Sequence, residues 1–143
     1  SYPKHCSNCK QFIYINPIPV CVMLVPFDGK LLAVRRGIDP HKGKPALPGG
    51  FVDFGESWQN AGSREVWEEV QIKIDPSGIE SFAIESTEDS HLILIFGIYK
   101  HLKSTDIEKF IISEEAMERI WVGPDQTLAF PLHDKIAKKY FQI

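Results

Sequence analysis

The stretch GFVDFGESWQNAGSREVWEEVQI, residues 50–72, decides what this chain folds into. Ser57 is a good N-terminal cap, and no proline follows it within the stretch, so we expect a helix from Ser57 to about Val70. Val66 and Val70 stand one turn apart and would face the core. Residues 37–48 are dense in Gly, Pro, His and Lys, which predicts a loop leading into this stretch.

Three carboxylates follow one face of the expected helix. Glu65, Glu68 and Glu69 project within an arc of about 100°, because each helical residue is rotated by about 100° from the last. Like charges at this spacing destabilise an exposed helix by roughly 0.2–0.5 kcal/mol per pair, so the cluster is not a device for stability. Hard divalent cations prefer such oxygen ligands, which predicts a metal site for phosphate chemistry. A solvated acidic helix face is the alternative explanation.

Strands are expected on both sides of this helix. Residues 18–25 and 30–35 are rich in apolar and β-branched residues, and the Asp28-Gly29 turn between them predicts a hairpin. Further strands are expected at residues 78–86, 91–100 and 120–122, and a second helix at residues 131–141, with Pro131 in its first turn. This order predicts an α/β fold in which helices pack on a mixed sheet.

The composition narrows the class of protein. The chain has 143 residues, 43% of them hydrophobic, which fits one globular domain. Its 19 acidic and 16 basic residues make it a poor binder of nucleic acid or anionic membranes. No apolar run is long enough to span a membrane and no export signal is visible. Because three cysteines are too few for a disulfide framework, we expect a cytoplasmic protein.

The spacing of the charged residues in the quoted stretch resembles the Nudix box, whose pattern is G-x5-E-x7-R-E-U-x-E-E-x-G-U with U apolar. Eight of the nine defined positions match, and the exception is Gln71, where the box has Gly. That glycine normally ends the helix in a left-handed conformation, which would cost Gln71 on the order of 1 kcal/mol. The resemblance implies an α/β/α sandwich with a mixed central sheet and hydrolysis of a nucleoside diphosphate linked to another group.

The resemblance also implies a role for each matching residue. The ligands of Mg2+, for which Mn2+ is an open substitute, would be Glu65, Glu68 and Glu69, with the carbonyl of Gly50 as a further ligand. Glu56 and Arg64 would form an ion pair that orients those ligands. Either a box glutamate or a residue outside the box would take the proton from water. For the outside residue we prefer Glu115, with Glu114 as the alternative.

Several other residues are candidates for substrate binding. Arg35, Arg36 and Lys44 could bind the phosphates, although each is equally well explained as a surface charge. Phe51 could offer a face on which a base stacks, while packing in the core is its alternative role. His133 has no partner at a spacing that suggests a site.

The start of the chain differs from the rest. Cys6-x-x-Cys9 followed by Tyr14-Ile-Asn-Pro17 is similar to the Nudix subgroup with a small N-terminal zinc ribbon. Two cysteines are half of a tetrahedral zinc site, so either the ribbon has degenerated, an upstream half is missing, or two chains share an ion. Zn2+ and a homodimer both stay open. We expect residues 1–16 to form a short appendage and residues 17–143 to form the Nudix hydrolase domain.

Three functions compete for this sequence. The first is a magnesium-dependent pyrophosphohydrolase acting on a small nucleotide, with ADP-ribose, a nucleotide sugar or a dinucleotide ahead of nucleoside triphosphates. The second is a non-catalytic Nudix domain that senses a nucleotide, although a pure binder need not keep three repelling glutamates. The third, an RNA-cap hydrolase, is disfavoured by the acidic balance and the lack of a basic stripe.

Overall fold

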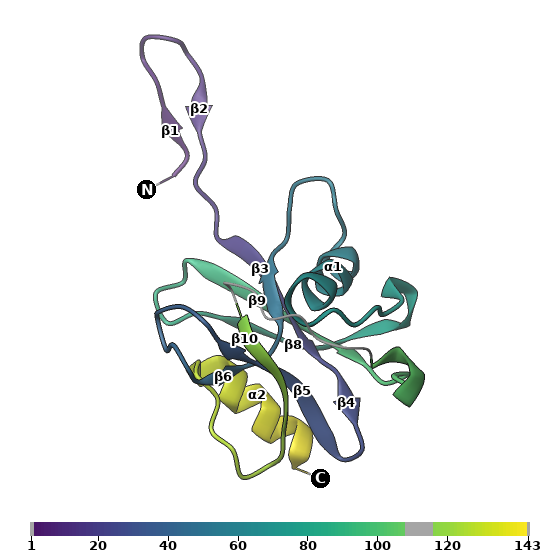
Figure 1. The fold of residues 1–143 in the computed structure, drawn as a ribbon. Coiled ribbons are helices and arrows are strands. Elements are labelled where there is room, and N and C mark those ends of the chain that lie inside the picture. The colour runs from purple at the N-terminus through teal and green to yellow at the C-terminus, as the bar shows by residue number, and fades with distance from the viewer. Residues whose placement is uncertain (1, 108–115, 143) are drawn as a thin grey trace.

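The computed structural model of the chain describes residues 2–107 and 116–142, and its centre is a four-stranded mixed sheet (Figure 1). The strands follow the order β7 (Gly49–Phe51), β3 (Ile18–Leu24), β9 (Leu92–Tyr99) and β8 (Ile79–Ser86). β3 runs parallel to β9, whereas the other two pairings are antiparallel. The expected α/β fold with a mixed central sheet is confirmed.

A second, antiparallel sheet is built around β5 (Lys30–Arg36). β5 pairs with β10 (Ala116–Val122), β4 (Pro26–Phe27) and the short strand β6 (Pro45–Ala46). The expected hairpin of residues 18–25 with 30–35 is therefore wrong in its extent, because only β4 pairs with β5 across the Asp28-Gly29 turn. β3 is buried from Cys21 onward. A strand that is apolar on both faces is more stable at the centre of the other sheet, where both faces are covered.

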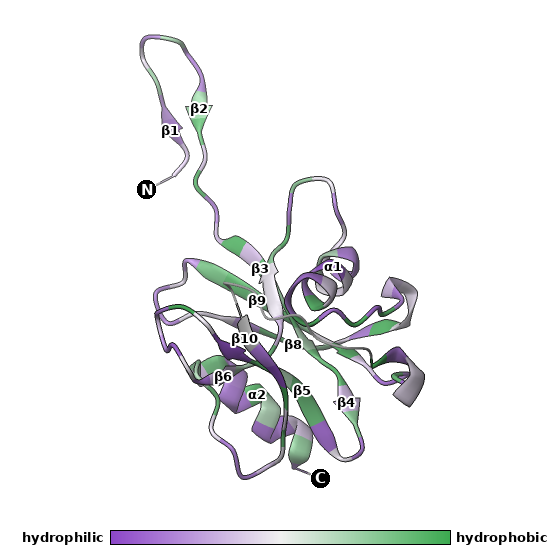
Figure 2. Ribbon diagram, viewed as in Figure 1, coloured by the Kyte–Doolittle hydropathy of each residue, from purple (hydrophilic) through white to green (hydrophobic). Residues whose placement is uncertain are grey.

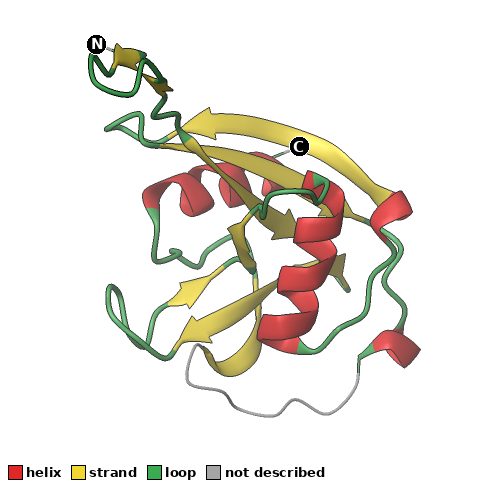
Figure 3. Cartoon of the chain, turned by 90° about the horizontal axis from the view of Figure 1, so that it is seen from above, coloured by secondary structure: helices red, strands yellow, loops and turns green. Residues whose placement is uncertain are grey.

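Two helices cover opposite faces of β3. Alternate strand residues point to opposite faces, so Cys21 and Met23 share a core cluster with α1 (Trp58–Val70), whereas Val22 and Leu24 share another with α2 (Pro131–Phe141). Figure 3 shows the two helices well apart with strands between them, and Figure 2 shows the mixed hydropathy along α2. Two short 3-10 turns, η1 (Pro76–Gly78) and η2 (Ser104–Asp106), complete the described chain.

Both ends of α1 behave as the sequence predicts. Ser57 is the N-terminal cap, and its side chain accepts a hydrogen bond from the Asn60 amide at 3.1 Å. Gln71 takes the left-handed conformation of the missing box glycine, with φ 57°. At this end the guanidinium of Arg119 donates to the carbonyl of Val70 at 2.7 Å, which satisfies one of the last carbonyls of the helix. The helix thus keeps its usual ending without the glycine.

The first residues form an arm that stands away from the rest of the protein (Figure 1). It consists of two short antiparallel strands, β1 (Lys4–His5) and β2 (Phe12–Ile13). Figure 2 shows that β1 is hydrophilic and β2 hydrophobic. Within the described ranges, no helix has both the length and the apolar character needed to cross a bilayer.

The His133 side chain of α2 is largely buried, with 8% of its surface exposed. Its Nδ1 accepts a hydrogen bond from the Leu47 amide at 3.2 Å. Its ring lies 5.0 Å from the Phe130 ring and 6.2 Å from the Phe96 ring, measured between centroids. This hydrogen bond links α2 to the segment that precedes β7.

Gly62 of α1 packs closely against β3 of the central sheet, and this contact gives a first prediction. A Cβ at this position would lie 2.6 Å from Met23 Sδ and 3.0 Å from Cys21 Sγ. Gly62→Ala should therefore destabilise the protein by about 1–3 kcal/mol, although alanine favours helix. Urea unfolding measures the change, and Asn60→Ala, at an exposed position of the same helix, is the control. Equal stability of Gly62→Ala and wild type would contradict this packing.

The buried histidine predicts that stability depends on pH. Burial, aided by Arg36, lowers the pKa of His133 from 6.5 to about 4. As the pH falls below 6.5, the unfolded chain binds a proton that the folded chain does not, so stability decreases by about 2 kcal/mol at pH 5. Urea unfolding at pH 7.5 and pH 5.0 should show a smaller loss for His133→Asn than for wild type. The same loss in both proteins would refute the assignment.

Candidate active site

The candidate site is organised around the guanidinium of Arg64, in the middle of α1. Arg64 donates to both oxygens of Glu56, with Nη2 2.7 Å from Oε1 and Nε 3.2 Å from Oε2. Nη2 also donates to the carbonyl of Phe51 at 3.0 Å. Glu56 in turn accepts from the Asp53 amide at 2.8 Å. These bonds fix the loop of residues 51–56 against the helix, as expected for the Glu56–Arg64 pair.

The other side of the same guanidinium contacts two box carboxylates. Nη1 of Arg64 lies 2.9 Å from Glu65 Oε1 and 3.2 Å from Glu68 Oε2. The hydrogen bonds from Arg64 lower the pKa of Glu56, and the contacts with Glu56 and Glu65 raise the pKa of Arg64. One cation therefore offsets part of the repulsion among the acidic side chains.

Glu65 is the most enclosed of these carboxylates, with a side chain that is 13% exposed. It lies directly over Gly50, where a Cβ would come within 2.4 Å of the Glu65 carboxyl carbon. A side chain at Gly50 would therefore displace the Glu65 carboxylate from its place over β7. Burial raises the pKa of Glu65, and the charge of Glu68 adds to the rise. A bound cation would remove this cost.

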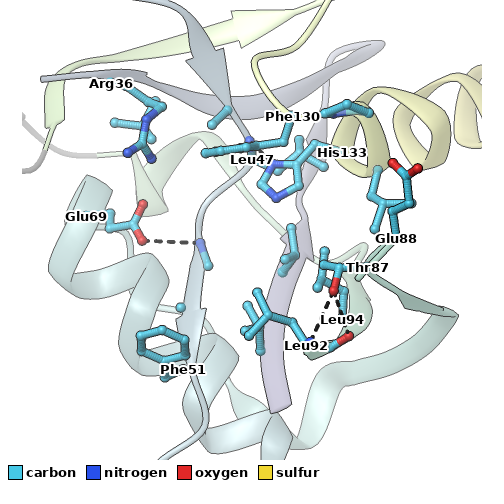
Figure 4. Close-up of a pocket in the computed structure, with 18 residues that line it drawn as sticks. Arg36, Leu47, Phe51, Glu69, Thr87, Glu88, Leu92, Leu94, Phe130 and His133 are labelled. Atoms are coloured by element: carbon cyan, nitrogen blue, oxygen red, sulfur yellow. Dashed lines mark hydrogen bonds between the residues drawn. The ribbon is translucent and has the colours of Figure 1, made fainter. Parts of the chain in front are cut away.

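Glu69 lies beside Glu65 and faces the same strand. Its Oε1 accepts a hydrogen bond from the Gly49 amide at 3.2 Å (Figure 4). Its carboxyl group is also hydrogen-bonded to that of Glu65. Glu65 and Glu69 therefore lie together against the backbone of β7. Glu68 does not join them, and its carboxylate contacts Arg64 instead. In residues 2–107 and 116–142, no three His, Cys, Asp or Glu side chains are grouped to hold a metal ion. The oxygen donors nevertheless fit Mg2+, because Glu68 is 48% exposed and reaches Arg64 through a rotatable side chain.

A pocket of about 700 Å3 opens beside Glu69. It lies between the two sheets and the start of α2, and its wall is mostly apolar (Figure 4). The polar groups on its wall include Glu69 and Arg36, with His133 and Glu88 further from the box helix. An apolar pocket with a few polar groups beside a carboxylate cluster is the usual form of a small-molecule site.

The structure separates the substrate-binding candidates into two groups. Arg36 and Phe51 line the pocket, and the Arg36 guanidinium lies 4.9 Å from the centre of the Phe130 ring. Arg35 instead donates to Glu118 at 2.5 Å and to the Gly43 carbonyl at 2.9 Å. Lys44 is not among the residues that line the pocket.

Two catalytic candidates lie outside the described residues, and two residues of the pocket wall have no signal in the sequence. Glu114 and Glu115 lie outside the described residues, so their role stays a prediction. Phe130 and His133 line the pocket, although no sequence pattern indicates them. The only available signal is their place at the start of the last helix, and their contact with Leu47 and Arg36 requires the folded chain.

The three cysteines are free thiols, and Cys6 and Cys9 lie near each other in the N-terminal arm. The Cys9 amide donates to Cys6 Sγ at 3.4 Å, and such hydrogen bonds lower the pKa of the Cys6 thiol. No third or fourth metal ligand joins them among the residues that the structure describes. Cys21 is buried in β3, where burial and nearby Glu65 raise its pKa to about 12. It is therefore a core residue, as a thiol of this kind is not nucleophilic.

Known proteins share both the sequence and the fold of this chain. Residues 16–142 match the family model described as NUDIX domain. An ADP-ribose pyrophosphatase of Methanocaldococcus jannaschii is 40% identical over 63 residues, which are 44% of this chain and 37% of that protein. The NAD-capped RNA hydrolase NudC of Chromobacterium violaceum is 36% identical over 73 residues, which are 50% of this chain and 26% of that protein. The chain thus spans well under half the length of these two relatives.

Among solved structures, a NUDIX hydrolase from Nitrosomonas europaea has the same fold. It superposes with a TM-score of 0.76 at 22% identity, covering 96% of this chain and 77% of that one. At this identity the similarity concerns the fold alone. The family match covers nearly the whole chain, including the helix with Glu65, Glu68 and Glu69. The chain therefore belongs to the Nudix hydrolase family.

Proposed function

We propose that this protein hydrolyses the diphosphate bond of a small nucleotide by attack of water on phosphorus. The observation that supports this most directly is the position of Glu69. It lies beside Glu65 on the backbone of β7 and also faces the pocket of about 700 Å3. A site for phosphate chemistry and a site for an organic group thus adjoin each other.

The residues of the box would have different roles in catalysis. Glu65, Glu68, Glu69 and the Gly50 carbonyl would hold Mg2+ or Mn2+, which neutralises phosphoryl oxygens and lowers the pKa of a bound water. Arg64, anchored by Glu56, positions Glu65 and Glu68. A carboxylate takes the proton of the attacking water, and Glu69 and Glu115 are the candidates.

The pocket suits the organic part of the substrate, and Arg36 on its wall would attract a phosphate. The name ADP-ribose pyrophosphatase of one relative supports a nucleoside diphosphate linked to a second group, such as ADP-ribose, a nucleotide sugar or a dinucleotide. Hydrolysis of nucleoside triphosphates is the alternative, followed by a nucleotide sensor without catalysis. The sensor is less favoured because a pure binder has no need for three carboxylates, Glu65, Glu68 and Glu69, on one face of a helix.

We also propose a role for the N-terminal arm. It would be an appendage to a Nudix domain of residues 17–143. The Cys6-x-x-Cys9 segment would be either a zinc ribbon that has degenerated or half of one that an upstream segment or a second copy completes. The protein would act in the cytoplasm on a small molecule.

Glu69→Gln tests the proposed chemistry. With Mg2+ and a panel of ADP-ribose, NADH, FAD, nucleotide sugars and nucleoside triphosphates, we expect turnover of at least one compound by the wild type. Glu69→Gln should lower kcat by about 10²- to 10⁴-fold, because it removes a charged ligand or the base. EDTA should abolish the activity and added Mg2+ should restore it.

The control for this test is Glu80→Gln, a charged-to-amide change on β8, where Glu80 pairs with Lys100 at the surface. Its activity should equal that of the wild type. The proposal fails if the wild type turns over no compound of the panel, or if Glu69→Gln is as active as the wild type.

Arg64→Lys tests whether Arg64 positions the metal ligands. Lysine keeps the charge but has three donors on a single atom, so it cannot replace the five hydrogen bonds that the guanidinium makes. The Mg2+ concentration that gives half the maximal rate should rise by about 10- to 100-fold. Measuring that concentration beside the melting temperature separates positioning from stability. An unchanged Mg2+ requirement would show that Arg64 has only a structural role.

A further inference from the structure

His133 has a proton whose position the fold determines. Its Nδ1 accepts the hydrogen bond of the Leu47 amide at 3.2 Å, so Nδ1 cannot carry the proton. A neutral imidazole carries one proton, which must therefore be on Nε2. Burial holds the pKa of His133 at about 4, so the ring is neutral at physiological pH. The side chain is a hydrogen-bond donor with a defined direction.

The Nε2–H group has no partner in the described part of the protein. The Nε2–H group donates to no residue in the ranges 2–107 and 116–142. In these same ranges, every fully buried side-chain nitrogen or oxygen has a hydrogen-bond partner. Nε2 must therefore be accessible rather than sealed in the core. Because His133 lines the pocket, the accessible edge of the ring opens into that space (Figure 4). The donor is available to a molecule in the pocket.

The surroundings of this donor favour a flat, uncharged ring. The Phe130 ring lies 5.0 Å from the His133 ring, and the aliphatic side chains of Val22, Leu92 and Leu94 contribute to the same wall. A charged group would be poorly solvated in such a wall, whereas an aromatic ring would contact it over its whole face. A neutral donor amid apolar walls pairs best with a ring nitrogen or a carbonyl oxygen.

We propose that His133 is a specificity-determining residue that donates, through Nε2–H, to an acceptor on the six-membered ring of the nucleobase of the substrate. The proposal rests on the proposed function, since it assigns the organic part of that substrate to this pocket. A base would enter with its acceptor edge toward α2, and its phosphates would extend toward Glu69 and Arg36. A ring of the same shape without an acceptor would leave the donor unsatisfied, which lowers affinity.

Binding measurements without turnover test this proposal. Isothermal titration calorimetry compares purine riboside 5′-monophosphate with benzimidazole riboside 5′-monophosphate, which has the same shape but lacks the nitrogens of the six-membered ring. The wild type should bind the purine compound about 10-fold more tightly. His133→Asn keeps an acceptor for Leu47 at the place of Nδ1 but has no group that reaches as far as Nε2. It should bind the two compounds equally.

A second variant and a spectrum separate recognition from packing. His133→Gln places an amide N–H near the former Nε2 and should restore part of the preference for the purine compound. Nitrogen-15 NMR of the wild-type histidine ring should show the proton on Nε2. The proposal is overturned if the wild type binds neither compound or both equally, if His133→Asn weakens both to the same extent, or if Nδ1 carries the proton. Discrimination without hydrolysis of any substrate would instead support this role of His133 and refute the proposed function.

Discussion

The acidic face of α1 can exist because one guanidinium is placed among its carboxylates. Arg64 contacts Glu56, Glu65 and Glu68 and binds the Phe51 carbonyl, and its own side chain is 29% exposed. Removing one partner of a buried ion pair costs about 3–5 kcal/mol, and somewhat less when water reaches it, as here. The contacts with Glu56 and Phe51 also hold the loop before α1. The interaction that compensates the charge is therefore also the one that fixes the backbone on which Glu65 and Glu69 rest.

That backbone is placed by β3, the strand that both cores share. Val20, Cys21 and Val22 pair with Phe51, Gly50 and Gly49 in antiparallel register. The strand is apolar on both faces, so α1 packs on one side and α2 on the other. Gly50 leaves its side-chain space to the Glu65 carboxylate, whereas a side chain at Gly49 would collide with the backbone of β3 at Cys21 and Val22. Because β3 is buried on both faces, the acidic helix α1 and the pocket lie at the same edge of the central sheet.

The sequence predicts the local features well and the long-range ones poorly. The limits of α1 and its Ser57 cap follow from patterns within residues 50–72, and the structure has both. The Arg64–Glu56 pair, which the resemblance to the Nudix box implies, is also present. The hairpin fails because the turn at Asp28-Gly29 does not indicate where its first strand changes sheet. Arg35 and Arg36 are alike in sequence, but neighbours on a strand face opposite sides, so only Arg36 lines the pocket. The role of His133 depends on its hydrogen bond with the amide of Leu47, which is 86 residues away in the sequence.

The two polar groups that the fold encloses beside this pocket have opposite electrostatic characters. Glu65 is a carboxylate whose charged form burial disfavours, so it gains from a cation beside it. His133 is an imidazole whose neutral form burial favours, so it gains from an uncharged acceptor. Burial therefore favours a positive charge at Glu65, whose neighbour Glu69 lines the pocket, and a neutral polar atom at His133 on the pocket wall. A molecule with an anionic, metal-binding end and an uncharged aromatic end satisfies both preferences at once, and a nucleotide has this form.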